Sequence, residues 1–160
     1  MNTATTSAFA AIAPTHAADY TLPVSGDRRL ARAWLWLALA ALIGSGLFSV
    51  LLVLARTPGI NAFLPAGDFF RTALVVHVDL SVLVWFVAIA GMLWSLNQRR
   101  AGSAWNMLAL VLAGLGALMM SAAPFAGPLL GGAPVMANYI PLLDGSLFRA
   151  GLVVFGLGSL

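Results

Sequence analysis

The stretch that decides the fold is residues 33–55, AWLWLALAALIGSGLFSVLLVLA, an apolar run without a charged side chain. A helix rises about 1.5 Å per residue, so this run reaches roughly 34 Å, enough to cross a hydrocarbon core of about 30 Å. Trp34 and Trp36 stand at its start, where aromatic rings favour the membrane interface. The run therefore predicts a membrane-spanning helix.

Three further apolar segments follow. We expect a second helix at residues 69–96, a third at 103–123, and a fourth that begins at 147 and is still apolar at 160. The last run reaches only about 21 Å, less than a full span. The predicted fold is all-α: a polytopic transmembrane helix bundle (residues 31–160) with three full helices plus the start of a fourth. A mobile polar tail (residues 1–30) is expected to precede it.

The composition agrees with a membrane protein. The chain is 61% hydrophobic and 8% charged, against about 45–50% and about 25% in soluble domains. Its mean hydropathy of +0.97 and its lack of cysteine exclude disorder, disulfide scaffolds, iron–sulfur clusters and thiolate metal sites. The basic residues are all arginines at segment ends, not a stripe interleaved with aromatics, so no nucleic-acid partner is expected.

The arginines also predict the orientation. Arg28, Arg29 and Arg32 precede the first expected helix, and Arg99 and Arg100 separate the second from the third. If the helices alternate in direction, both groups lie on the same side of the membrane. The positive-inside rule places that side, and the N-terminus, in the cytoplasm. The second helix then starts outside and runs inward.

His77 is the strongest candidate functional residue. It lies about 12 Å into the second helix, in the outer half of the membrane. Histidine is rare in membrane helices and suggests a function by default, and imidazole is a good ligand for haem iron or copper. Two interpretations stay open: an axial ligand of haem iron, or a packing histidine bonded to a neighbouring helix. Ser81, on the same helix face, and Gly44, in a small-residue run, would admit a flat cofactor.

Three charged residues accompany this histidine. Asp79 lies about 200° round the helix from His77, so the two cannot pair on one helix; it is either a proton relay or a structural hydrogen-bond anchor. Arg71 either pairs with Asp68 or snorkels, or it contacts a buried anion such as a haem propionate. Asp68 lies where a carboxylate suits the N-cap of the second helix.

The stretch FFRTALVVHVDLSVLVWFVAIAGMLWSL (residues 69–96) resembles the second helix of haem–copper oxidase subunit I, a superfamily that includes cytochrome c oxidases and nitric oxide reductases. Residues 133–152, APVMANYIPLLDGSLFRAGL, resemble the loop and helix start after the third helix of some bacterial members. The similarity covers about residues 30–160.

This resemblance implies that His77 is the axial ligand of a low-spin haem, with Arg71, Ser81 and Gly44 among the cofactor-binding residues. It implies an N-terminal part of a terminal oxidase, not catalytic alone, in the bacterial inner membrane. The high-spin haem and the copper site would lie in the missing remainder. The implied partners are the remaining helices of subunit I or other oxidase subunits, cytochrome c or another electron donor, and the lipid bilayer.

Two other interpretations compete with this one. The chain could be a non-redox transporter or channel subunit with His77 and Asp79 in a proton or ion path. It could also be a structural or assembly subunit whose polar residues only pack. Bound haem would distinguish the oxidase from both.

Overall fold

The computed structural model describes residues 26–65, 68–98, 104–135 and 141–160. The expected tail therefore falls almost wholly outside the described residues. The elements, in chain order, are α1 (Arg28–Ala55), η1 (Asn61–Phe63), α2 (Phe69–Asp79), η2 (Leu80–Val84), α3 (Trp85–Asn97), α4 (Ala104–Ala122), η3 (Ala123–Phe125), α5 (Gly127–Gly131), β1 (Pro134–Val135), β2 (Leu142–Leu143) and α6 (Ser146–Ser159).

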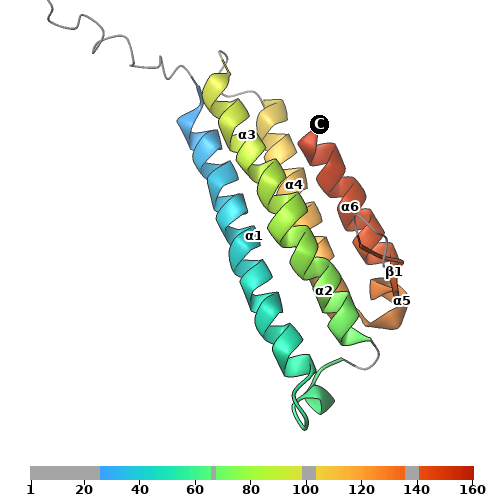
Figure 1. Ribbon diagram of the computed structural model, residues 1–160. Coiled ribbons are helices and arrows are strands. Elements are labelled where there is room, and N and C mark those ends of the chain that lie inside the picture. The colour runs from blue at the N-terminus through green and yellow to red at the C-terminus, as the bar shows by residue number, and fades with distance from the viewer. Residues whose placement is uncertain (1–25, 66–67, 99–103, 136–140) are drawn as a thin grey trace, which may run out of the picture.

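The predicted helix bundle is confirmed. Three helices are long and apolar enough to cross a membrane, at Arg28–Ala55, Phe69–Asn97 and Ala104–Phe125, and a shorter apolar helix spans Ser146–Ser159. Figure 1 shows α1, the continuous α2–α3 rod, α4 and α6 lying side by side. The protein is therefore a multi-pass membrane protein.

Two details differ from the sequence prediction. The first helix begins at Arg28, not at residue 33, because the Asp27 carboxylate caps it by accepting hydrogen bonds from the backbone N–H groups of Arg29 (3.0 Å) and Leu30 (3.1 Å). The segment between the third and fourth apolar runs, where the sequence analysis predicts no helix or strand, contains the short helix α5 and the antiparallel pair β1–β2, in which Pro134 lies opposite Leu143.

The α1–α3 contact depends on one close approach. The Trp34 ring is buried, and it lies against Gly91 of α3. A Cβ placed on Gly91 would come within 2.6 Å of Trp34 Cδ2. Small residues allow such contacts between helices in lipid, where packing replaces the hydrophobic effect as the driving force. Glycine at position 91 thus lets the large indole ring sit between the two helices.

Helices α4 and α6 approach each other even more closely. A Cβ on Gly116 would lie 2.5 Å from the carbonyl oxygen of Gly151 and would also meet the backbone nitrogen of Phe155. These are backbone atoms, which cannot rotate away. Gly158 meets the backbone of α4 in the same way, at Ala109 and Ala113. The stability of this helix pair therefore requires glycine at these positions.

We expect Gly116→Val to destabilise the α4–α6 pair by about 1–3 kcal/mol or more, because the added side chain must displace the backbone of α6. The matched control is Gly114→Val in the same helix, where an added Cβ meets nothing within 4 Å. Unfolding in mixed detergent micelles, followed by circular dichroism, measures the difference. Equal stability of the two variants would contradict the close contact.

Candidate functional site

His77 is held against α1 by its Nδ1 atom. Nδ1 lies 2.9 Å from the backbone oxygen of Ser45, 2.9 Å from Ser45 Oγ and 3.2 Å from Ser49 Oγ. A carbonyl oxygen only accepts, so Nδ1 carries the proton and donates. The Ser45 hydroxyl donates its own hydrogen to the backbone oxygen of His77 at 3.0 Å. This hydrogen-bond pattern places a proton on Nδ1 of the imidazole.

The other ring nitrogen, Nε2, is left open. Within the described part of the chain, no group forms a hydrogen bond to Nε2. His77 is half-buried. Its Nδ1 is thus fixed on α1, whereas Nε2 has no described hydrogen-bond partner. Metal-binding histidines have this arrangement: the second nitrogen donates to a carbonyl or carboxylate, which fixes the ring and raises its basicity.

The helix changes from α-helical to π-helical winding shortly after His77. Residues Leu80–Val84 form a π-helical turn between α2 and α3. The Ser81 hydroxyl donates to the backbone oxygens of His77 (2.9 Å) and Val78 (3.1 Å). Single π-turns are rare and occur often at functional sites. The apolar pattern of residues 69–96 predicted a continuous helix and did not predict this turn.

Gly44 lies in the contact between α1 and the π-helical turn. A Cβ there would come within 3.3 Å of Leu80 Cδ1, so glycine lets α1 approach closely enough for Ser45 to reach His77. The structure thus gives Ser81 and Gly44 positions that support His77. Their direct contact with a cofactor stays a prediction.

Asp79 is separated from His77, as the helical geometry predicted. It is 3% exposed, and its Oδ2 atom has no hydrogen-bond partner in the described part of the chain. His77 bonds to serines of α1 instead. No hydrogen bond that the structure describes joins the two side chains.

Two arginines, Arg71 and Arg56, have contacts at the start of α2. Arg71 Nη1 lies 3.3 Å from Asp68 Oδ2, with side chains 62% and 46% exposed, so the local pair is confirmed; at this exposure it contributes little to stability. The N-cap prediction for Asp68 is wrong in one respect. Asp68 occupies that position, but its carboxylate turns toward Arg71 and makes no cap hydrogen bond. The Arg56 guanidinium carbon lies 3.9 Å from the centre of the Phe70 ring, which ties the end of α1 to the start of α2 through a cation–π contact.

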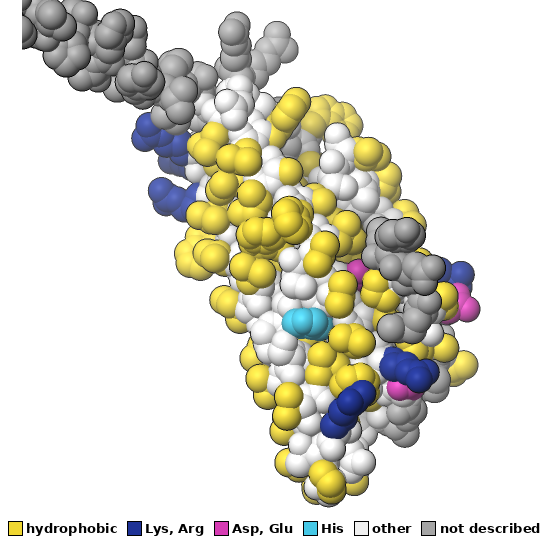
Figure 2. Space-filling model, viewed as in Figure 1, with side chains coloured by type: hydrophobic (Ala, Val, Ile, Leu, Met, Phe, Trp, Pro, Cys, Tyr) yellow, Lys and Arg dark blue, Asp and Glu magenta, His cyan; other side chains and the backbone are white. Residues whose placement is uncertain are grey.

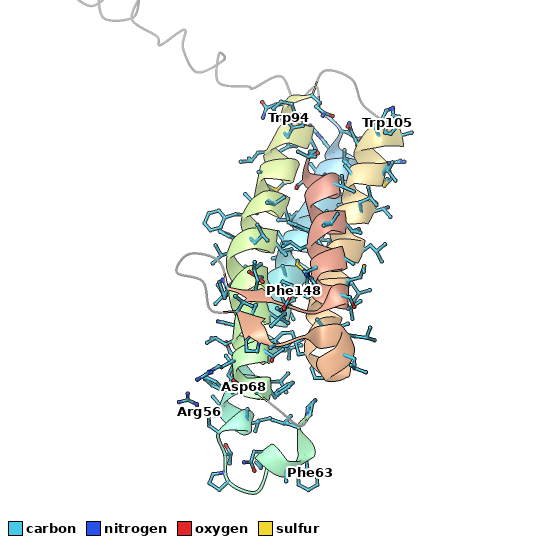
Figure 3. The ribbon with its side chains drawn as sticks, turned by 90° about the vertical axis from the view of Figure 1, so that its right-hand side faces the viewer. Arg56, Phe63, Asp68, Trp94, Trp105 and Phe148 are labelled. Atoms are coloured by element: carbon cyan, nitrogen blue, oxygen red, sulfur yellow. The ribbon has the colours of Figure 1, made fainter. Side chains whose placement is uncertain are left out.

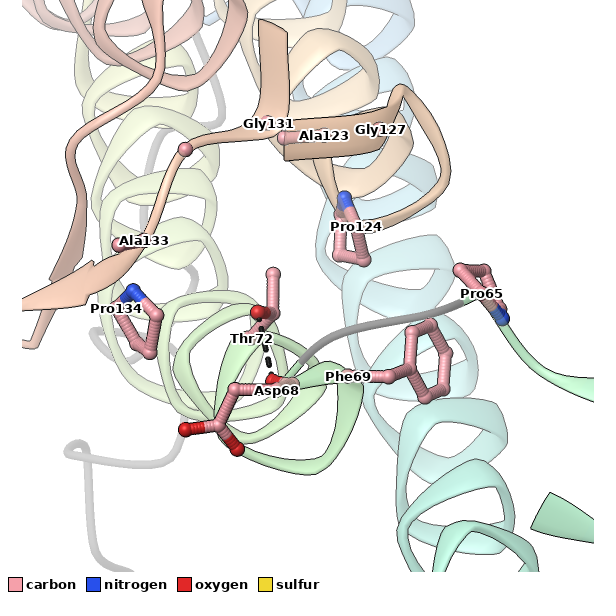
Figure 4. A pocket seen from close by; sticks show the side chains of 11 residues that line it. Pro65, Asp68, Phe69, Thr72, Ala123, Pro124, Gly127, Gly131, Ala133 and Pro134 are labelled. Atoms are coloured by element: carbon pink, nitrogen blue, oxygen red, sulfur yellow. Dashed lines mark hydrogen bonds between the residues drawn. The ribbon is translucent and has the colours of Figure 1, made fainter. Parts of the chain in front are cut away.

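A cavity of about 260 Å³ lies between the start of α2 and the loop around α5 (Figure 4). Its polar lining includes Asp68 and Thr72, and the Thr72 hydroxyl donates to the backbone oxygen of Asp68 at 2.9 Å. His77 does not line it. These polar groups already have partners, so the open Nε2 of His77 is the stronger candidate site.

The two serines that hold His77, Ser45 and Ser49, were not predicted as site residues, because nothing in one sequence says which helix His77 will face. The spacing of four residues does place both hydroxyls on one face of α1. Among the described residues, no group of three His, Cys, Asp or Glu side chains could hold a bare metal ion.

The fold and site define a multi-pass membrane protein in which His77, the one histidine of the described residues, is held against a neighbouring helix. The chain is 30% identical to Uncharacterized protein RP382 of Rickettsia prowazekii (strain Madrid E), over 83% of this chain and 30% of that protein. It is 32% identical to an uncharacterized protein of Aquifex aeolicus (strain VF5), over 78% of this chain and 31% of that protein. The chain thus spans about three tenths of the length of these relatives. No family model and no solved structure matches it.

We expect Ser45→Ala to cost about 1 kcal/mol of unfolding free energy, because it removes the bond to the His77 backbone and one acceptor for Nδ1–H. The matched control is Ser121→Ala in α4, whose hydroxyl donates only within its own helix, to Ala117 O at 2.8 Å. Denaturation in micelles gives both values. Nitrogen NMR should still show a protonated Nδ1, since the Ser45 carbonyl remains; a switch to Nε2–H would contradict the assigned proton on Nδ1.

Proposed function

We propose that the chain is the N-terminal part of a membrane terminal oxidase subunit I of the haem–copper type, in which His77 binds the iron of a low-spin haem. One observation supports this most directly: Nδ1–H is fixed on the Ser45 carbonyl, while Nε2 of this half-buried side chain has no described partner. A packing histidine would be expected to form hydrogen bonds with both ring nitrogens.

The residues present fit a haem better than a bare metal ion. A porphyrin brings four nitrogen ligands of its own, so a haem would suit a site with one histidine and no cluster of three protein ligands among the described residues. His77 would hold the iron. Arg71 and Arg56, at the outer end of the same helix pair, would neutralise the propionates. When bound, haem supplies one-electron transfer.

In this role the protein would position the His77 imidazole and tune its basicity. The Ser45 carbonyl accepts the hydrogen bond from Nδ1–H, and this contact would leave Nε2 as the ligand atom and orient the ring. Ser81 and Ser45 both bond the His77 backbone, which holds that residue in place beside the π-helical turn. These contacts limit movement of the ligand, and they would therefore limit reorganisation during electron transfer.

Any further protein ligand to the haem would come from beyond the described residues, in which His77 is the one histidine. The remaining helices of subunit I, or another subunit, would supply it, in keeping with the short span of this chain on its relatives. The proposed chain is therefore not catalytic alone; it would carry electrons from cytochrome c or another donor toward an oxygen-reducing high-spin haem and copper site.

The alternative of a transporter or structural subunit has less support. A proton or ion path through His77 and Asp79 needs polar groups between them, and no described hydrogen bond joins these residues. We place the proposed oxidase in the bacterial inner membrane with its N-terminus in the cytoplasm, because Arg28, Arg29 and Arg32 lie at the start of α1.

His77→Ala should abolish the low-spin haem band in the reduced-minus-oxidised absorption spectrum of the purified native assembly, because no described side chain nearby can replace the imidazole. Two controls should keep the band: His16→Ala, which removes the other histidine, and Asp79→Asn, on the other side of the helix. Assembly is checked by size-exclusion chromatography. A wild type without haem would refute the function, and an unchanged band in His77→Ala would refute the ligand.

A further inference from the structure

Helix α1 is longer than the membrane core requires. It has 28 residues and so extends about 42 Å, against a hydrocarbon thickness of about 30 Å. About 20 residues counted back from Ala55, which precedes the charged Arg56, reach Trp36. The turns before Trp36 therefore lie in the headgroup layer, and these turns carry Arg28, Arg29 and Arg32.

Exposed tryptophans mark the same level on the neighbouring helices. Trp36 is 65% exposed, Trp94 70% and Trp105 78%. Figure 3 shows Trp94 and Trp105 at one end of the bundle, and Figure 1 shows that α1 starts at that end. Indole rings favour the membrane interface. Two independent features, helix length and the tryptophans, thus place the three arginines beside lipid headgroups.

The charge of these arginines is not neutralised within the described residues. All three are exposed, and none forms an ion pair with a described side chain; Figure 2 shows arginine side chains projecting at the start of α1. Arg71 and Arg149, in contrast, each pair with an aspartate, at 3.3 and 3.4 Å. The described acid beside the three arginines, Asp27, is engaged in capping the helix. The first turn of α1 therefore presents three guanidinium groups to the membrane surface.

An apolar stripe continues from the arginines along the same face of α1. Residues 32, 36, 43 and 47 recur at spacings of four and seven, which keeps them on one side of a helix. Ile43 and Leu47 are 65% and 62% exposed. The face thus combines cations at headgroup level with a hydrocarbon surface beneath them, and this combination matches one molecule with an anionic head and an acyl chain.

We propose that Arg28, Arg29 and Arg32 bind the phosphate of an anionic phospholipid whose acyl chain lies along the α1 stripe from Trp36 to Leu47. Guanidinium groups recognise phosphate oxygens through paired hydrogen bonds. The cytoplasmic leaflet is rich in anionic lipids, and each arginine near its surface favours them by about fivefold in association constant. This proposal is independent of haem and of the oxidase function.

The test uses the full chain in non-ionic detergent micelles, where insertion topology has no effect. Brominated phosphatidylglycerol or brominated phosphatidylcholine is titrated in, and quenching of Trp36 is obtained as the difference between wild type and Trp36→Phe. We expect phosphatidylglycerol to quench at a concentration at least about fivefold lower than phosphatidylcholine. High salt should weaken the preference, because it screens exposed charges.

Matched variants separate recognition from a change of fold. R28Q/R29Q/R32Q should lose the preference, whereas R28K/R29K/R32K, which keeps the charge, should retain most of it. R149Q removes an arginine that is already paired with Asp144 and should leave the lipid preference unchanged. Circular dichroism confirms that each variant is helical. Equal quenching by the two lipids, a preference that survives the triple glutamine variant, or its loss to inorganic phosphate at constant ionic strength would each overturn the proposal.

Discussion

The hydrocarbon core of a membrane contains no water for backbone N–H and C=O groups, and the rest of this structure depends on that constraint. Each unsatisfied group would cost several kcal/mol, so a segment that crosses the core must be helical. The same constraint acts on side-chain hydroxyls. Ser45, Ser81 and Ser121 all donate to backbone oxygens, and Ser45 alone among these three bonds across to another helix. These serine hydroxyls thus donate either to the backbone of their own helix or to the backbone of a neighbouring helix.

The link between Ser45 and His77 is the point where packing and candidate chemistry meet. Gly44 lies beside Leu80 of the π-helical turn, and in the same contact between helices the Ser45 carbonyl oxygen lies 2.9 Å from Nδ1. This hydrogen bond occupies Nδ1 and leaves Nε2 as the ring nitrogen without a described partner. Asp79 is buried on the opposite side of α2, and its Oδ2 atom has no hydrogen-bond partner among the described residues.

The arginines of the described residues fall into two groups. Arg71, Arg149 and Arg56 each have a partner within the protein, an aspartate or an aromatic ring. The three arginines at the start of α1 are exposed and form no ion pair with a described side chain.

The sequence by itself determined the class of fold. Long apolar runs can satisfy their backbones in lipid only as helices, so residues 33–55, 69–96 and 103–123 predicted three spans within a few residues of those observed. It also singled out His77 and placed Asp79 on another face, because a helix has a fixed period. The tertiary structure alone decided the serine partners of His77, the proton on its Nδ1, the π-helical turn and the turning of Asp68 from its cap toward Arg71. These depend on which helix faces lie together, and that is set by packing between segments distant in the chain, a relation that the period of one helix does not contain.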